Sequence, residues 1–428
     1  MTKYAKQRQA KPRITARAAG LLFSPPGLIV ICVVLLWAAW SGLTVIAIIC
    51  GLAISAAGLS VIWGHLALKN LRGECSFSDL RGFPGDKVEF KLRMINRKVL
   101  PLPWAEINLD VPTGFPINEK ASESDLDGFV KITRSSPLLW YSVMSWKGSL
   151  SGRKRGYYRL GPLSVTTGDI FGFYPRTLIE PSADHLIVYP RLFDIDRLTL
   201  STAYPLGEAL SEKRWFEDPS RTIGVRDYSP GDSLRRIHWK ASARRQQLQV
   251  KVFESTTTLK VALFLVADSF QRQETILEDE LETGISMAAS LASYCIEKKN
   301  QVGLWTNSRL ADSGLPARIP AGSGVECLVQ ILEALAKATP ASHQTFSQFF
   351  QSESEQLPAG ATLVFIFSRV SPELITTLVE ARNSGYKILA LQTGEATDSE
   401  IWPEIPRYLI DPSGQITAVR YGGTDAGS

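Results

Sequence analysis

The sequence predicts a multidomain membrane-anchored protein: a two-helix transmembrane hairpin, an all-β sandwich, and then an α/β open-sheet domain. Three observations predict this order. Two apolar runs occupy residues 21–40 and 43–68, short alternating runs fill residues 70–200, and apolar strands alternate with helical patterns over residues 259–428. At 428 residues the chain exceeds one ordinary core, since domains usually hold about 100–200 residues.

The composition is that of a folded protein without extensive disorder. Apolar residues make up 45% of the chain and charged residues 21%. The net charge of +5 is modest, so nucleic acid is not expected as a partner. The five cysteines show no pairing or Cys-x-x-Cys spacing, which predicts neither a zinc site nor a disulfide framework and suits a reducing compartment.

The two apolar runs predict a membrane hairpin. Neither contains Asp, Glu, Lys or Arg, each approaches the ~20 residues that cross a bilayer, and only Ser41 and Gly42 separate them. A cleaved signal peptide is the alternative, but a second full-length run follows at once. Residues 1–20 are basic, and Lys69 and Arg72 follow the second run. Because Lys and Arg stay inside, we expect a multi-pass plasma-membrane protein whose termini and soluble domains are all cytoplasmic.

Residues 70–200 show the pattern of a β-sandwich. Val88, Phe90, Leu92 and Met94 alternate with charged residues, so one face of this strand is buried and the other is wet. Another alternating run covers residues 105–111. We expect residues 112–141 to form a loop or irregular hairpin. The cations and tyrosines of residues 152–159 indicate a protected strand edge rather than a surface that binds nucleic acid.

Residues 259–428 show the alternation of an α/β sheet. Residues 260–267 form a continuous apolar run, which is typical of a buried parallel strand. The pattern then predicts helices at 276–298, 325–338 and 372–383, and strands at 302–305, 363–367 and 386–391. Strands and helices in this order favour an open sheet.

Between these two domains, residues 201–258 form a connector and a signature segment. The connector is polar over residues 198–223, and we expect it to be solvated with one helical stretch. The signature segment runs from Arg226 to Glu254, RDYSPGDSLRRIHWKASARRQQLQVKVFE. It contains seven Lys or Arg residues between Arg226 and Lys251 against two acids, so its surface is locally basic.

The signature segment predicts a helix followed by a strand. A Pro-Gly turn leads to a helix that we expect to start at Asp232, with Leu234, Ile237 and Ala241 on its buried face. Arg236, Lys240 and Arg244 form a cationic stripe at spacings of four, which repels unless anions face it. After residue 245, alternation predicts a strand with Leu248 and Val250 on one face and Gln249 on the other.

The signature resembles that of the bacterial domain-of-unknown-function family 58, whose members carry a similar Arg-x-Tyr-x-Pro-Gly-Asp turn, an Ile-His-Trp-Lys helix and a following Ala-Arg. The matching positions are Arg226, Tyr228, Pro230, Gly231, Asp232, Ile237, His238, Trp239, Lys240, Ala243 and Arg244. YRLGPLSVTTGDIFGFYPR and HLIVYPR extend the resemblance to most of the chain from about Arg72 onward. The resemblance implies a bacterial membrane protein often associated with MoxR-type AAA+ ATPases.

The same resemblance makes residues 259–428 similar to a von Willebrand factor A-like domain. Such domains usually hold a metal through Asp-x-Ser-x-Ser after the first strand. Here Asp268 occupies the first position, but Phe270 and Arg272 replace the two hydroxyls. Magnesium prefers hard oxygen ligands, so we expect no metal and no other cofactor, and we expect Asp268 to cap a loop or helix.

Three functions remain open. The preferred one is a non-enzymatic, membrane-tethered adaptor or scaffold, whose Arg236, Lys240 and neighbouring cations meet an acidic partner. A MoxR-type ATPase is the partner implied by resemblance, possible roles being cell-envelope protein assembly or maturation. In the second, Arg226, Asp232, Arg236, Lys240 and Glu254 pair among themselves and staple two domains together. The third is a hydrolase that uses His238 with Asp232, although the sequence contains no familiar catalytic motif.

Overall fold

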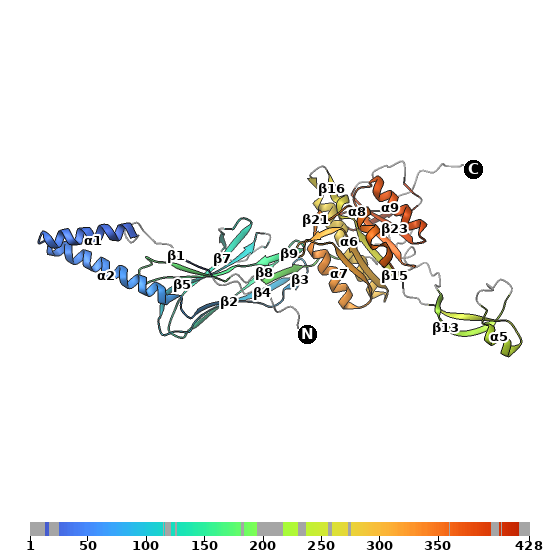
Figure 1. The fold of residues 1–428 in the computed structure, drawn as a ribbon, viewed down its shortest axis with the longest axis horizontal. Coiled ribbons are helices and arrows are strands. Elements are labelled where there is room, and N and C mark those ends of the chain that lie inside the picture. The colour runs from blue at the N-terminus through green and yellow to red at the C-terminus, as the bar shows by residue number, and fades with distance from the viewer. Residues whose placement is uncertain are drawn as a thin grey trace. The chain divides into compact units, whose positions relative to one another are not determined.

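The computed structural model describes residues 13–16, 25–113, 115, 121–124, 126–180, 184–194, 217–229, 237–255, 259–272, 275–358, 360–394, 402–403 and 405–418. The chain divides into two compact units, Met1–Tyr189 and Pro190–Ser428 (Figure 1). The division of the chain into five segments stays a prediction.

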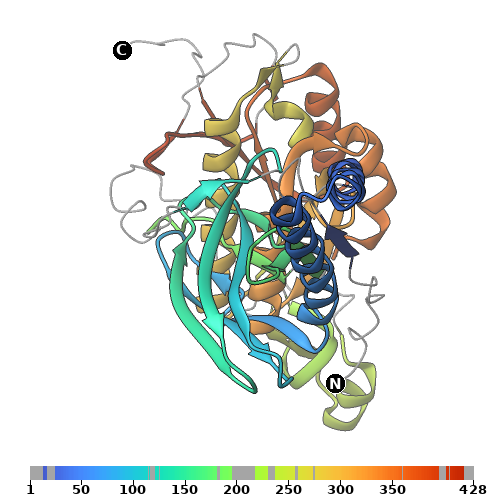
Figure 2. The same ribbon diagram turned by 90° about the vertical axis from the view of Figure 1, so that its left-hand side faces the viewer.

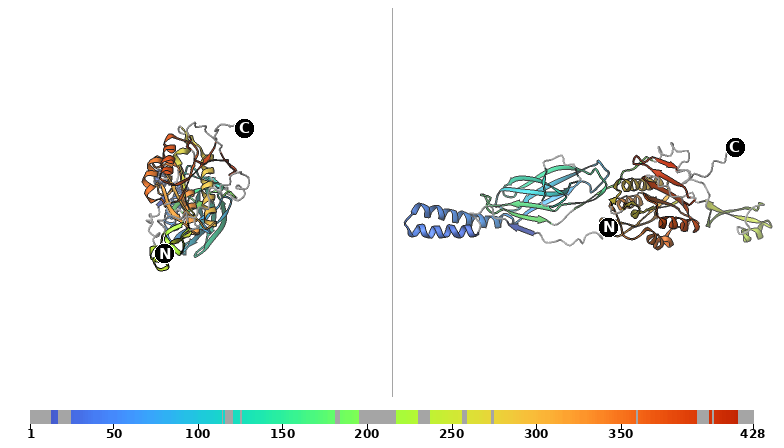
Figure 3. Two further views of the ribbon diagram at one scale, coloured as in Figure 1. Left: turned by 90° about the vertical axis from the view of Figure 1, so that its right-hand side faces the viewer. Right: turned by 90° about the horizontal axis from the view of Figure 1, so that it is seen from above.

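After strand β1 (Arg13–Ala16), the N-terminal unit has two apolar helices, α1 (Pro25–Trp40) and α2 (Thr44–Ala67). They lie antiparallel, joined by a turn in which Gly42 has a φ of +73° (Figure 3). Within the described part of the chain, α2 alone is long and apolar enough to cross a membrane, and α1 is a shorter apolar helix. Residues 21–24 of the first predicted span lie outside the described residues.

The remainder of the N-terminal unit is a β-sandwich with one shared core. One sheet has the strand order β1 (Arg13–Ala16), β11 (Arg176–Glu180), β10 (Leu163–Thr167), β5 (Leu102–Pro112), β7 (Phe129–Leu138) and β6 (Ala121–Glu123). Two three-stranded sheets are β2 (Leu71–Phe77), β4 (Lys87–Asn96) and β8 (Val143–Ser151), and β3 (Arg81–Gly82), β12 (Asp184–Val188) and β9 (Gly156–Leu160). Phe90 and Leu92 of β4 share a buried cluster with Ile107 and Leu109 of β5, as the alternation predicts. Figure 2 shows the strands of the sandwich in blue to green.

Of the two forms expected for residues 112–141, a loop or an irregular hairpin, the structure shows a hairpin, because β6 pairs antiparallel with β7 from Ala121↔Ile132 to Glu123↔Val130. This stretch contains β6 and the ten-residue strand β7, which pairs with β5 from Leu102↔Leu138 to Pro112↔Phe129. The strand is easily missed because Arg134, Ser135 and Ser136 interrupt its apolar pattern. Its partner β5 supplies the backbone bonds that its side chains do not signal.

The basic N-terminus also holds a strand that the sequence does not signal. Strand β1 pairs antiparallel with β11, from Arg13↔Ile179 to Ala16↔Arg176. The chain before α1 is thus fixed to the sandwich that follows α2.

The C-terminal unit is built on a seven-stranded mixed sheet. Its order is β20 (Ala317–Gly322), β18 (Gln301–Thr306), β15 (Lys260–Leu265), β22 (Thr362–Phe367), β23 (Lys387–Thr393), β24 (Arg407–Ile410) and β25 (Ile416–Ala418). The five strands from β18 to β24 are parallel, and the two edge strands are antiparallel. The predicted open α/β sheet is therefore present, and its edge strands escaped prediction.

Helices cover this sheet. They are α6 (Glu278–Glu297), α7 (Val325–Lys337), α8 (Phe346–Glu353) and α9 (Pro372–Asn383), with 3₁₀ turns at η2 (Ala267–Phe270) and η3 (Ser354–Gln356). Alternate residues of β15, among them Phe264, pack against Phe349 of α8 and Leu378 of α9. Helix α6 contacts the same sheet together with α7. The unit also contains two short ribbons: β16 (Gln271–Arg272) with β17 (Thr275–Ile276), and β19 (Ser308–Leu310) with β21 (Ala338–Ser342).

Candidate functional site

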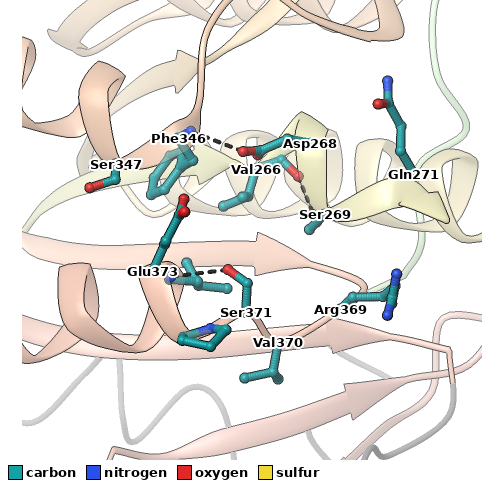
Figure 4. Close-up of a pocket in the computed structure, with 12 residues that line it drawn as sticks. Val266, Asp268, Ser269, Gln271, Phe346, Ser347, Arg369, Val370, Ser371 and Glu373 are labelled. Atoms are coloured by element: carbon teal, nitrogen blue, oxygen red, sulfur yellow. Dashed lines mark hydrogen bonds between the residues drawn. The ribbon is translucent and has the colours of Figure 1, made fainter. Parts of the chain in front are cut away.

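The first candidate site is a pocket at the carboxyl end of the parallel sheet. From β15 the chain crosses to β18 on one side and later to β22 on the other, so the strand order reverses between β15 and β22. Ligands of open α/β sheets usually bind at such a switch point. A pocket of about 360 Å³ lies there (Figure 4). Its lining residues include Asp268, Ser269, Gln271, Ser347, Arg369, Ser371 and Glu373.

Asp268 is held by protein donors, as expected of a cap. One carboxylate oxygen accepts the backbone N–H of Phe346, the first residue of α8, at 2.9 Å. The other accepts the side-chain amide of Asn307 at 3.1 Å. The prediction that Asp268 caps a helix is confirmed, because the amide hydrogens of a helix's first turn need such an acceptor.

The neighbouring hydroxyls are also engaged with the backbone. Ser269 Oγ donates to the Val266 carbonyl at 2.6 Å and accepts the N–H of Ser368 at 3.1 Å. Ser371 caps α9 by accepting the N–H of Leu374 at 3.1 Å. Among the described residues no group of three or more His, Cys, Asp or Glu side chains gathers as a metal site. The side chains of Asp268, Ser269 and Ser371 therefore bond mainly to the backbone that forms the walls of the pocket.

The second candidate site is the signature segment, which forms an antiparallel pair of strands and a short helix. Strand β13 (Glu217–Asp227) pairs with β14 (Gln249–Ser255), and α5 (Trp239–Arg245) lies between them in the chain. The predicted strand after residue 245 is present. Of the connector, residues 195–216 lie outside the described residues, and the strand already begins at Glu217.

The predicted start of the signature helix is wrong. Ile237 is not on a helix face but forms a β-bridge with Val250, and α5 begins only at Trp239. His238 precedes the helix, and its Nδ1 accepts the N–H of Ala241 at 3.1 Å. His238 is therefore the N-cap, and the helix begins seven residues after Asp232, its expected start. Pro230, Gly231, Asp232, Leu234 and Arg236 lie outside the described residues.

A buried polar network, which the alternation pattern missed, ties α5 to the strands. Gln249, predicted to lie on the face opposite Val250, is fully buried, and its side chain donates to the carboxylate of Asp227. Its backbone N–H donates to Ser242 Oγ at 2.8 Å, and that hydroxyl lies 3.1 Å from the His238 carbonyl. The available signal was a glutamine between two apolar residues, Leu248 and Val250. Leu248, predicted to share a face with buried Val250, is instead exposed.

The outer surface of α5 is aromatic and basic. Trp239 is 69% exposed, and Lys240, Ala243, Arg244 and Arg245 are also exposed. In the signature strands Arg226 is exposed and donates to the Asp227 carbonyl at 3.2 Å, and Tyr228 is half-buried with its N–H bonded to Leu248 O. The Glu254 side chain lies outside the described residues. We name the α5 set (Trp239, Lys240, Arg244 and Arg245) the α5 surface.

Part of this chain is similar in sequence to known proteins. The family described as protein of unknown function DUF58 matches residues 224–420, which include the signature segment and the α/β sheet but not the sandwich. The uncharacterized protein YeaD of Bacillus subtilis is 26% identical over 221 residues, covering 51% of this chain and 52% of that protein. The chain thus spans about half the length of this relative.

Solved structures show only weak likeness. An aerotolerance-related membrane protein from Bacteroides fragilis is 14% identical, covering 38% of this chain and 82% of that one, with a TM-score of 0.24. A cohesin module from a Clostridium perfringens family 33 glycoside hydrolase is 17% identical, covering 27% and 96%, with a TM-score of 0.21. These scores are too low to support any inference. The family match and the relative together support the DUF58 family for the C-terminal half of this chain.

Proposed function

We propose that this chain is a non-enzymatic, membrane-tethered adaptor that docks an acidic protein partner on the α5 surface. Its α/β unit is proposed to be a von Willebrand factor A-like domain with a metal site that no longer works. The partner implied by the family resemblance is a MoxR-type AAA+ ATPase, and the proposed setting is the maturation or assembly of cell-envelope proteins in a bacterial plasma membrane.

The observation that carries this proposal is the exposure of Trp239 beside Lys240 and Arg244. Trp and Arg are strongly enriched among the interface residues that contribute most of the binding energy. Trp239 is 69% exposed, so a large apolar ring lies in contact with water unless a partner covers it. The cations would select an acidic surface and speed its association. The network of Asp227, Gln249 and Ser242 holds the helix that carries these side chains.

Membrane attachment is supported by the pairing of β1 with β11. If α2 crosses a bilayer, its first residue, Thr44, lies on the face opposite the sandwich. Strand β1 is nevertheless hydrogen-bonded to the sandwich, so α1 must carry the chain back across. Two crossings with both ends on one side are thus favoured over a single anchor, and the basic N-terminus assigns that side to the cytoplasm.

Affinity measurements with charge-reversed variants test the adaptor. In the full chain in detergent, Lys240→Glu with Arg244→Glu should weaken binding of the purified MoxR-type ATPase on the order of tenfold, with nucleotide present and absent. The control is Arg153→Glu with Lys154→Glu, which makes the same charge change on exposed sandwich residues. Equal binding by both variants would sink the adaptor. If the charge-reversed α5 variant loses hydrogen-exchange protection at the backbone amides of β13 and β14, the interdomain staple is favoured instead.

The hydrolase hypothesis requires a separate test, because His238 Nδ1 already accepts the Ala241 N–H. This bond leaves only Nε2 for chemistry, and Nε2 carries the proton in the tautomer that the bond requires. His238→Asn preserves a capping oxygen but offers no base. A hydrolase should lose complementation with both His238→Ala and His238→Asn, whereas the adaptor should tolerate His238→Asn.

A further inference from the structure

We propose that the end of the sandwich nearest α2 is a membrane-docking face, whose loop tips enter the interfacial layer of the bilayer that the helices cross. The face consists of three loops, residues 97–101, 139–142 and 168–175. This inference rests on the proposed membrane hairpin and goes beyond it, because it makes the sandwich itself a lipid-binding module.

Strand registers place the three loops at one end. Strand β2 starts directly after α2, and its first residue pairs with the end of β4, Leu71↔Asn96. The start of β5 pairs with the end of β7, Leu102↔Leu138, and with the end of β10, Ala105↔Thr167. The loops that join these strands therefore surround the point where α2 enters the sandwich (Figure 1). The N–H of Tyr141 also donates to the Lys98 carbonyl at 3.1 Å, which joins two of the loops.

The docking face carries an unusual concentration of exposed apolar side chains. These are Val99, Leu139, Trp140, Tyr141, Ile170 and Phe171. Trp140 is 61% exposed and Phe171 57% exposed. Single exposed apolar residues need no explanation, but a group of them at one end marks a binding surface. Trp and Tyr are the residues that favour the boundary between lipid and water.

The tip at residues 168–175 is held in shape rather than left loose. The Asp169 carboxylate is buried and accepts the N–H groups of Phe171 at 3.1 Å and Tyr174 at 2.9 Å. Burial raises the pKa of Asp169, but hydrogen bonds led by that of Tyr174 outweigh it and leave the pKa below its usual value. Trp104 Nε1 donates to the Asp169 carbonyl at 3.1 Å. Protein contacts thus hold Phe171 in an exposed position.

The lengths of α1 and α2 require the bilayer surface to lie at the level of these loops. Helix α2 has 24 residues, about 36 Å at 1.5 Å per residue. Its last turns are gripped by the sandwich: Trp63 and Ala67 join the sandwich core, and His65 Nδ1 lies 2.8 Å from Arg176 of β11. Residues 44–59 leave about 24 Å, less than the roughly 30 Å of hydrocarbon. The 16-residue α1 is equally short, so the bilayer surface must reach the end of the sandwich.

The chemistry of the face selects lipid as its occupant. The exposed cations Lys69 and Arg97 stand beside the apolar tips, an arrangement that suits anionic headgroups above acyl chains. The face is also continuous with the apolar surface of α2, where Ile62 and Leu66 are exposed. A second copy of this chain would have to displace the bilayer from around α2 to reach the same surface.

Nitroxide labelling of the full chain in vesicles of phosphatidylcholine and phosphatidylglycerol tests the proposal. Single cysteines are placed in a cysteine-free background at exposed sites: Trp140→Cys and Phe171→Cys on the face, Leu126→Cys at the opposite end of the sandwich, and Leu52→Cys in α2. The label at position 52 reports the hairpin itself. Accessibility to oxygen and to a water-soluble nickel complex is compared at the four sites.

We expect label 52 in hydrocarbon, and labels 140 and 171 several-fold less accessible to nickel than label 126. If label 52 is inserted while 140 and 171 match 126, the docking face is refuted and the hairpin stands. If label 52 is in water, the hairpin fails and the docking face with it. Dipolar broadening between labels at 171 would mean that a second copy covers the face, which also refutes lipid docking.

Discussion

At the scale of single residues, Asp268 decides between a metal site and a cap. Its two oxygens accept N–H groups from Phe346 and Asn307, so Asp268→Ala removes two hydrogen bonds and should lower the free energy of unfolding by about 1–3 kcal/mol. The loss should be the same with and without Mg²⁺ in chemical denaturation. Glu373→Ala removes an exposed carboxylate at the same pocket, and it should lower the free energy of unfolding by only a few tenths as much as Asp268→Ala does. Stabilisation of the unaltered protein by Mg²⁺ that Asp268→Ala abolishes would contradict the cap.

His238 makes a second prediction at this scale. Because its Nδ1 satisfies the Ala241 N–H, His238→Ala should destabilise α5 by about 0.5–2 kcal/mol, whereas His238→Asn should cost far less. Hydrogen exchange of the Ala241 and Ser242 amides measures this directly. Equal protection in all three proteins would show that the ring does not cap the helix.

At the scale of elements, the contact of Lys98 with the C-terminus of α2 should make the free energy of unfolding depend on pH. Its ammonium group donates to the carbonyls of Ala67 and Lys69, the second at 2.8 Å, and burial lowers its pKa from 10.5 to about 8. Between about pH 8 and 10.5 the unfolded chain therefore holds a proton that the native chain has released. The free energy of unfolding should rise with pH across this window, since the neutral amine still has two N–H donors.

Lys98→Met provides the comparison. The difference in unfolding free energy between the original protein and Lys98→Met, measured in detergent, should grow from pH 8 to pH 10.5. Other lysines and tyrosines titrate equally in both proteins and cancel. A difference that stays constant over this window would contradict the lowered pKa of Lys98.

Elements were predictable where burial alone fixes the pattern. Strand β15 is apolar from Val261 to Leu265 because both of its faces are covered, and α9 begins with a Ser-Pro cap and repeats at helical spacing. Helix α8 was missed although Phe346, Phe349 and Phe350 share one face, because Ser and Gln dilute the apolar signal around them. Strand β1 exists only through its pairing with β11, and no local pattern reports a partner that lies so far along the chain.

The signature segment shows the same limit at a site. Its turn and basic residues were recognisable, but the helix start was not, since a histidine N-cap lacks the usual Ser or Asp signal. Alternation placed Gln249 on the face opposite Val250 and gave no sign that its amide is buried. Its burial depends on Asp227 and Ser242, which approach only after β13 and β14 have paired.

For the whole molecule, the topology proposed from β1 predicts which residues face each side of the membrane. A single cysteine replaces Ser41 in the turn between α1 and α2, exposed Arg153 in the sandwich, or exposed Leu315 in the α/β unit, each in a cysteine-free background. Because β1 and β2 both belong to the sandwich, only position 41 should react with a membrane-impermeant maleimide in intact cells. Positions 153 and 315 should react only after permeabilisation. Labelling of position 315 in intact cells would place the α5 surface beyond the reach of a cytoplasmic ATPase, and the adaptor would fail together with the topology.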